Sequence, residues 1–170
     1  VKSASFEKLG NLINFIAPLC KKFNIKFIIN DHPELAKIYN LDGVHVGEND
    51  PSIFRCRSLL GKNKIIGKSC YSSISLAQSA QTRGANYVAF GSFFKTKTKL
   101  KTKKVFLRNI LAWNKIKKIP SVGIGGINSK NLFTIKNIQL EYLAISSFIW
   151  TSNSKPEVSI KKIKNLIDNF

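Results

Sequence analysis

Two aspartates follow short apolar runs, at points where predicted strands end. Asp31 directly follows the run KFIIN, and Asp50 comes three residues after the run GVHVG. If these runs are neighbouring parallel strands, the two carboxylates converge at one edge of a sheet. One or two carboxylates, completed by water and substrate phosphate oxygens, are a usual ligand set for Mg²⁺. The alternative is that each aspartate caps the helix expected after Pro33 or Pro51.

A stretch of alternating threonine and lysine follows another apolar run, YVAFG. Thr96, Thr98 and Lys99 lie in this stretch. Backbone N–H groups, hydroxyls and an ammonium are all hydrogen-bond donors and can share the oxygens of one anion. We therefore predict that this loop binds a pyrophosphate.

Two further strand ends carry small residues suited to a second anion. Gly125 and Gly126 follow the run SVGI, and Ser146 and Ser147 follow YLAI. Glycines before a helix allow the backbone to approach an oxyanion closely, although a plain tight turn is the alternative. In barrel enzymes, the loops after the seventh and eighth strands commonly hold a phosphate. The pattern favours a monophosphate site here.

Six apolar runs alternate with seven helical patterns, which indicates one α/β domain over residues 1–170. The predicted strands are 26–30, 43–47, 64–69, 87–91, 121–126 and 142–147. The predicted helices are 6–23, 33–39, one from Pro51, 72–83, 105–118, one capped by Ser129, and 158–170. Continuous apolar strands are typical of a parallel sheet buried on both faces. Such a sheet is either doubly wound or a (β/α)₈ barrel.

The chain lacks the G-x-G-x-x-G entry of a dinucleotide fold, begins with a helix and contains no methionine. These features favour a (β/α)₈ TIM barrel that lacks about its first two strands.

The composition narrows the class of function. The chain has 28 Lys+Arg against 9 Asp+Glu, a net charge of +19, which attracts anions such as nucleic acids or phosphorylated substrates. A base-biased genome is the alternative source of this lysine content. No apolar run approaches the roughly 18 residues that would span a bilayer. Cys20, Cys56 and Cys70 are far apart, which suggests reduced thiols in a cytoplasmic protein.

Five motifs in order, IIND, DGVHVGEND, IIGKS, GANYVAFGSFFKTKTK and VGIGGIN, resemble the thiamine-phosphate synthase family. The resemblance extends from about residue 26 to 150. It implies a TIM-barrel transferase of thiamine biosynthesis that joins an aminopyrimidine methyl pyrophosphate to a thiazole monophosphate and releases pyrophosphate. It also implies Mg²⁺ as cofactor and small phosphorylated molecules as partners, without nucleic acid or membrane. Homo-oligomer formation is left open.

The resemblance assigns roles to individual residues. Lys99 and Ser69 would be catalytic, and Asp31 and Asp50 would hold the metal. The residues that would contact the pyrophosphate are Asn30, Thr96, Thr98, Lys99 and Lys2. The residues that would bind the thiazole phosphate are Gly125, Gly126 and Ser147, with Ser146 as a further substrate-binding residue.

Some positions depart from the family pattern. Glu48 stands where glutamine is usual, and Ser92 and Lys95 replace prolines. A thiazole tautomerase-like relative or an inactive homologue is therefore an alternative, and a basic nucleic-acid-binding protein is a more distant one. The presence of Asp31 and Asp50 together with the Thr–Lys loop favours the synthase.

Overall fold

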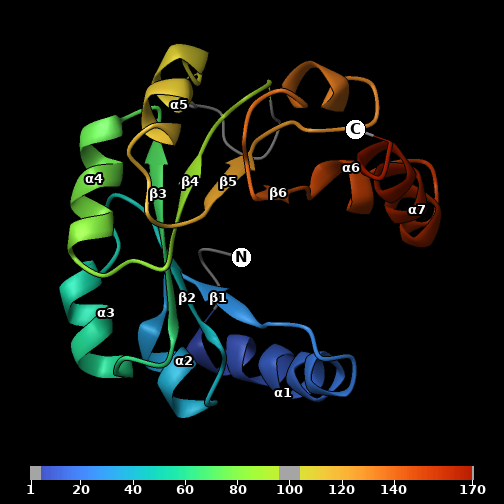
Figure 1. Ribbon diagram of the computed structural model, residues 1–170. Coiled ribbons are helices and arrows are strands. Elements are labelled where there is room, and N and C mark those ends of the chain that lie inside the picture. The colour runs from blue at the N-terminus through green and yellow to red at the C-terminus, as the bar shows by residue number, and fades with distance from the viewer. Residues whose placement is uncertain (1–4, 96–103, 170) are drawn as a thin grey trace. The chain divides into compact units, whose positions relative to one another are not determined.

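The computed structural model describes residues 5–95 and 104–169 (Figure 1). The strands are β1 (Ile28–Asn30), β2 (Gly43–Val46), β3 (Ile65–Tyr71), β4 (Tyr87–Phe90), β5 (Ser121–Ile124) and β6 (Tyr142–Ala144). The helices are α1 (Phe6–Lys22), α2 (Pro33–Ile38), α3 (Ile53–Leu60), α4 (Ile74–Thr82), α5 (Leu107–Asn114), the 3₁₀ helix η1 (Leu132–Ile135), α6 (Ser147–Trp150) and α7 (Pro156–Ile167). All six predicted strands are therefore confirmed, with small shifts at their ends.

The strands form a sheet in the order β1-β2-β3-β4-β5-β6. The pairs β1–β2, β2–β3, β4–β5 and β5–β6 are parallel. A doubly wound sheet reverses its strand order at a switch point, whereas this order follows the sequence without reversal. The structure thus confirms a parallel α/β fold with the strand sequence of a TIM-like barrel.

The chain divides into two compact units. Unit 1 comprises Val1–Lys68 and Arg83–Asn86, and unit 2 comprises Ser69–Thr82 and Tyr87–Phe170. In unit 1 the largest apolar side chains that lose all solvent contact come from the strands, namely Val44 and Val46 of β2 and Ile66 of β3. Helix α2 covers β1 and β2 with Leu35 and Ala36, both buried.

Arg57 of α3 holds together the loops at the N-terminal end of the strands in unit 1 through side-chain hydrogen bonds. Its guanidinium donates to four backbone carbonyls and one amide oxygen: Gly61 O at 2.7 Å, Lys62 O at 3.2 Å, Lys64 O at 2.9 Å, Gly84 O at 2.8 Å and Asn86 Oδ1 at 2.8 Å. Asn86 also exchanges bonds with Ile66, because its N–H donates to Ile66 O and its Oδ1 accepts from Ile66 N–H. This arginine therefore fixes the loops at the end of the sheet that does not carry the predicted site.

Unit 2 has its own core, centred on Trp113 of α5. Trp113 is fully buried, packs against Phe90, and donates from Nε1 to Ser121 Oγ at 2.9 Å. Trp150 of α6 is by contrast 71% exposed. The two tryptophans of the chain thus lie in opposite environments.

The helices bury narrower faces than the sequence pattern predicts. In α5, Ile110 and Trp113 are buried, but the apolar residues Leu107 and Leu111 are 48% and 52% exposed. In α1 the buried apolar residues are Leu9 and Ile13, and the exposed ones are Phe6, Leu12, Phe15, Ile16 and Leu19. The apolar side chains of α1 therefore extend over more of the helix surface than the described residues of unit 1 cover.

Three local expectations were wrong. The segment after Ser129 forms only the 3₁₀ helix η1, whose N-cap is Asn131 rather than Ser129 and makes no side-chain capping bond. The helix after Pro51 begins at Ile53, because Ser52 is its N-cap and accepts from Arg55 N–H. Strand β3 continues to Tyr71, so the predicted strand end at Ser69 lies inside the strand.

Within residues 5–95 and 104–169, the helices are all too short or too polar to cross a lipid bilayer.

Candidate active site

Asp31 is the first residue after β1 and has an unusual backbone conformation. Its φ is 68°, in the left-handed region that non-glycine residues seldom adopt. Its N–H donates to His45 O at 2.9 Å, and the next N–H, of His32, donates to Asn30 O at 2.9 Å. The N-cap of α2 is His32, so Asp31 does not occupy the capping position. Such backbone outliers concentrate at functional sites, and this one places Asp31 at the C-terminal edge of the sheet.

Asp50 folds back onto the end of β2. Its Oδ2 accepts from Gly47 N–H at 2.6 Å, and a β-carbon added to Gly47 would lie 2.9 Å from this oxygen. Glycine is therefore the residue that lets the carboxylate approach the strand end so closely. Because the N-cap of α3 is Ser52, Asp50 is not the cap of that helix either. Neither aspartate therefore occupies the N-cap position of the helix that follows it.

A lysine that the sequence analysis did not select lies at the same edge of unit 1. Lys68 of β3 is in register with Val46, and its Nζ donates to Gly47 O at 2.5 Å. The side chain is half-buried. The available signal was Lys68 itself, a charged residue inside the predicted strand KIIGKS.

The carboxylates fit the ligand type that Mg²⁺ prefers. Asp31 and Asp50 belong to adjacent strands whose register pairs Asn30 with His45, so both start from the same sheet edge. Among the described residues there is no group of three or more His, Cys, Asp or Glu side chains that could hold a metal alone. Mg²⁺ held by one or two carboxylates usually completes its ligand set with water and substrate oxygens.

The glycine turn of unit 2 follows β5. Gly125 and Gly126 have φ values of 103° and 67°, which favour glycine, and a β-carbon on Gly125 would collide with Ser92. The Gly126 carbonyl accepts from the side-chain amides of Asn128 at 3.1 Å and Asn131 at 2.9 Å. These asparagines fix the turn, and they were not predicted although the spacing N-x-x-N begins two residues after Gly126.

The residues that lead into the Thr–Lys stretch contact this turn through backbone hydrogen bonds. Phe93 N–H donates to Ile124 O at 3.1 Å, and Phe94 N–H donates to Gly125 O at 3.0 Å. Ser92 O accepts from Val105 N–H at 3.0 Å, which joins the residues on either side of the loop. The predicted site residues Thr96, Thr98 and Lys99, and also Lys2, lie outside the described residues.

The three predicted serines belong to unit 2. Ser69 is half-buried inside β3. Ser146 is exposed and precedes α6, and Ser147 is the first residue of that helix. The two serines after β6 thus lie at the carboxyl end of their strand, as predicted, whereas Ser69 does not.

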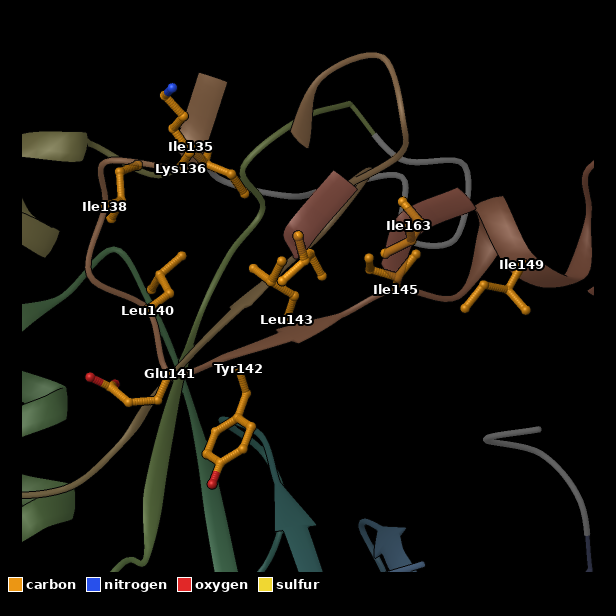
Figure 2. Close-up of a pocket in the computed structure, with 11 residues that line it drawn as sticks. Ile135, Lys136, Ile138, Leu140, Glu141, Tyr142, Leu143, Ile145, Ile149 and Ile163 are labelled. Atoms are coloured by element: carbon orange, nitrogen blue, oxygen red, sulfur yellow. The ribbon is translucent and has the colours of Figure 1, made fainter. Parts of the chain in front are cut away.

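An apolar groove of about 410 Å³ runs along β6 in unit 2 (Figure 2). Its lining residues are Ile135, Lys136, Ile138, Leu140, Glu141, Tyr142, Leu143, Ile145, Ile149, Ile163 and Ile167. None of the described residues predicted for the site lines this groove. Its aliphatic walls also offer few donors to a phosphate, so it is not the predicted anion site.

Comparison with known proteins places these features in a family. A family model described as thiamine monophosphate synthase matches residues 1–149. The thiamine-phosphate synthase of Pelagibacter ubique is 43% identical, and the match covers 88% of this chain and 72% of the relative. The thiamine-phosphate synthase of Nitrosospira multiformis is 40% identical, and the match covers 79% of this chain and 58% of that relative.

A solved structure agrees with the fold. The thiamine phosphate pyrophosphorylase from Pyrococcus furiosus superposes with a TM-score of 0.89 at 24% identity, over 99% of this chain and 80% of that one. Since the family model spans most of the sequence and the motif strands occur in the expected order, this chain belongs to the thiamine monophosphate synthase family.

Proposed function

We infer that the protein is a thiamine-phosphate synthase. The reaction joins an aminopyrimidine methyl pyrophosphate to a thiazole monophosphate and releases pyrophosphate. The observation that carries this inference is the family match over residues 1–149, which includes both site aspartates. The position of those aspartates at adjacent strand ends, where neither is a helix cap, supports it.

The chemistry needs charge stabilisation and alignment more than proton transfer. Loss of pyrophosphate leaves a methylene cation stabilised by the pyrimidine, and the thiazole nitrogen captures it. The protein binds the leaving group, holds both rings in line and excludes competing water. A general base is therefore not required, which agrees with a predicted residue set rich in hydrogen-bond donors.

Each predicted residue has a role in this scheme. Asp31 and Asp50 would hold Mg²⁺, which would neutralise charge on the leaving pyrophosphate. The residues proposed to donate to that pyrophosphate are Asn30, Thr96, Thr98, Lys99 and Lys2. Those proposed for the thiazole phosphate are Gly125, Gly126, Ser146 and Ser147, and Ser69 is proposed to lie near the pyrimidine.

We further propose that the fold is a single-domain (β/α)₈ barrel. The unreversed parallel order of six strands supports this, and a barrel of that type has two strands more than those described. A cytoplasmic location is also part of the proposal, and the three thiols at Cys20, Cys56 and Cys70 support it.

The test is formation of thiamine phosphate from the two substrates with and without Mg²⁺. We expect Lys99→Ala and Asp31→Ala each to lower turnover by about 10²- to 10³-fold, with unchanged melting temperature. Lys130→Ala and Glu157→Ala, which change the same charges elsewhere, serve as controls. Near-normal turnover in both site variants, or turnover that chelation does not affect, would contradict the assignment.

A further inference from the structure

The backbone of Gly47 lies between a lysine ammonium and a predicted metal ligand and contacts both. Lys68 Nζ donates to Gly47 O at 2.5 Å, and Gly47 N–H donates to Asp50 Oδ2 at 2.6 Å. With standard backbone bond lengths, these contacts place the ammonium within about 9 Å of the Asp50 carboxylate. All three residues belong to unit 1.

At this separation the lysine acts on whatever binds at the sheet edge. This separation is at most about one Debye length at physiological salt, and the half-buried side chain is screened less than a surface charge. The ammonium therefore repels a divalent cation at Asp50. It attracts an anion at the same edge, so the bare metal and the pyrophosphate feel Lys68 with opposite signs.

We propose that Lys68 biases the edge formed by Asp31 and Asp50 toward the anion, so that pyrophosphate binds more readily than the bare metal. The metal then enters with the anion or after it. This inference rests on the proposed function, since it concerns the same site, and it adds an electrostatic residue that sets the order of binding. A purely structural lysine would only hold the turn from Gly47 to Asp50.

Two separate binding constants distinguish these roles. The affinity of Mn²⁺ is measured by titration with detection of the free ion by electron paramagnetic resonance. The affinity of inorganic pyrophosphate is measured by calorimetry with divalent ions chelated. In Lys68→Met we expect Mn²⁺ to bind about three- to tenfold more tightly and pyrophosphate about three- to tenfold more weakly.

Two control variants separate charge from general effects. Lys68→Arg keeps the cation, and we expect both constants to stay within about twofold of the wild type. Lys64→Met removes the same charge from the residue before β3, four residues or about 13 Å from Lys68, where the Lys64 Nζ donates to Asn40. We expect it to leave both constants unchanged.

Weakening of both constants in Lys68→Met would mean that Lys68 only supports the turn, and would overturn the proposal. Unchanged constants would overturn it as well. If the shifts occur in opposite directions but the wild type forms no thiamine phosphate, the proposed function fails while the role of Lys68 stands. If the wild type binds neither Mn²⁺ nor pyrophosphate, both fail.

Discussion

Replacing Gly47 by alanine tests whether the Asp50 carboxylate must lie against the end of β2. The added β-carbon would lie 2.9 Å from Asp50 Oδ2. Apart from residues 46–48, Asp50 is the only described residue with atoms within 4 Å of this β-carbon. The carboxylate is the end of a flexible side chain, so it gives way by a few tenths of an ångström while the backbone stays in place. The substitution therefore moves a predicted metal ligand without disturbing the core.

The structure sets the size of the expected effect. A hydrogen bond to a charged group contributes about 1.5–3 kcal/mol when buried, and the half-burial of Asp50 reduces this to about 1 kcal/mol. For a chain of this size that loss lowers the melting temperature by about 2–4 °C. Displacing a ligand by a fraction of an ångström is expected to lower kcat/KM about tenfold or more, since a misplacement of about 1 Å can cost about 10²-fold.

Gly84→Ala is the matched control. Gly84 has φ 88° and no atom near the position of an added β-carbon, so alanine there also costs about 1 kcal/mol through backbone strain. We expect both variants to have a lower melting temperature than the wild type, and only Gly47→Ala to have a lower kcat/KM and a weaker affinity for Mn²⁺. If Gly47→Ala keeps wild-type values for both while melting like Gly84→Ala, the geometry assigned to Asp50 is wrong.

Three further predictions concern stability. Trp113→Phe leaves the buried Ser121 hydroxyl without its donor, so the free energy of unfolding measured by urea denaturation should fall by about 2–3 kcal/mol. A fall below about 0.5 kcal/mol would contradict the role of that hydrogen bond. Arg57→Lys cannot reproduce the five acceptor contacts of the guanidinium, so the free energy of unfolding in the same assay should fall by about 2 kcal/mol. Wild-type stability would show that these contacts contribute little. Burial raises the pKa of Tyr87 from 10.0 to about 12, so the folded state keeps this proton longer than the unfolded state. Stability should be level below pH 10 and fall between pH 10 and 12, and Tyr87→Phe should lessen that fall; an unchanged alkaline profile would refute this.

The strands could be predicted because burial on both faces leaves a continuous apolar signal. The run GVHVG, for example, gives β2 within one residue of its observed end. Helices were less well predicted at their ends, where side chains compete for backbone groups. The Asn128 amide oxygen accepts from Lys130 N–H and the Asn131 amide oxygen accepts from Asn128 N–H, and after these local side-chain bonds only the 3₁₀ helix η1 follows.

The site could be predicted only in part, for a related reason. Asp31 and Asp50 were found because they follow strand ends, and that position is visible in sequence. The closure of Asp50 onto Gly47 was not visible, because it depends on a turn three residues long rather than on periodicity. Lys68 was missed since its role arises from register with Val46 across two strands, which a single sequence does not display.

The opposite surroundings of the two tryptophans make the protein its own optical reporter. Trp113 is fully buried, so its emission should shift to longer wavelength only when unit 2 unfolds. Trp150 is exposed and ends the short helix that begins at Ser147, so quenching by a soluble ion and any change on adding the thiazole substrate should come from its signal. One fluorescence spectrum can thus separate loss of structure from occupancy of the segment that follows β6.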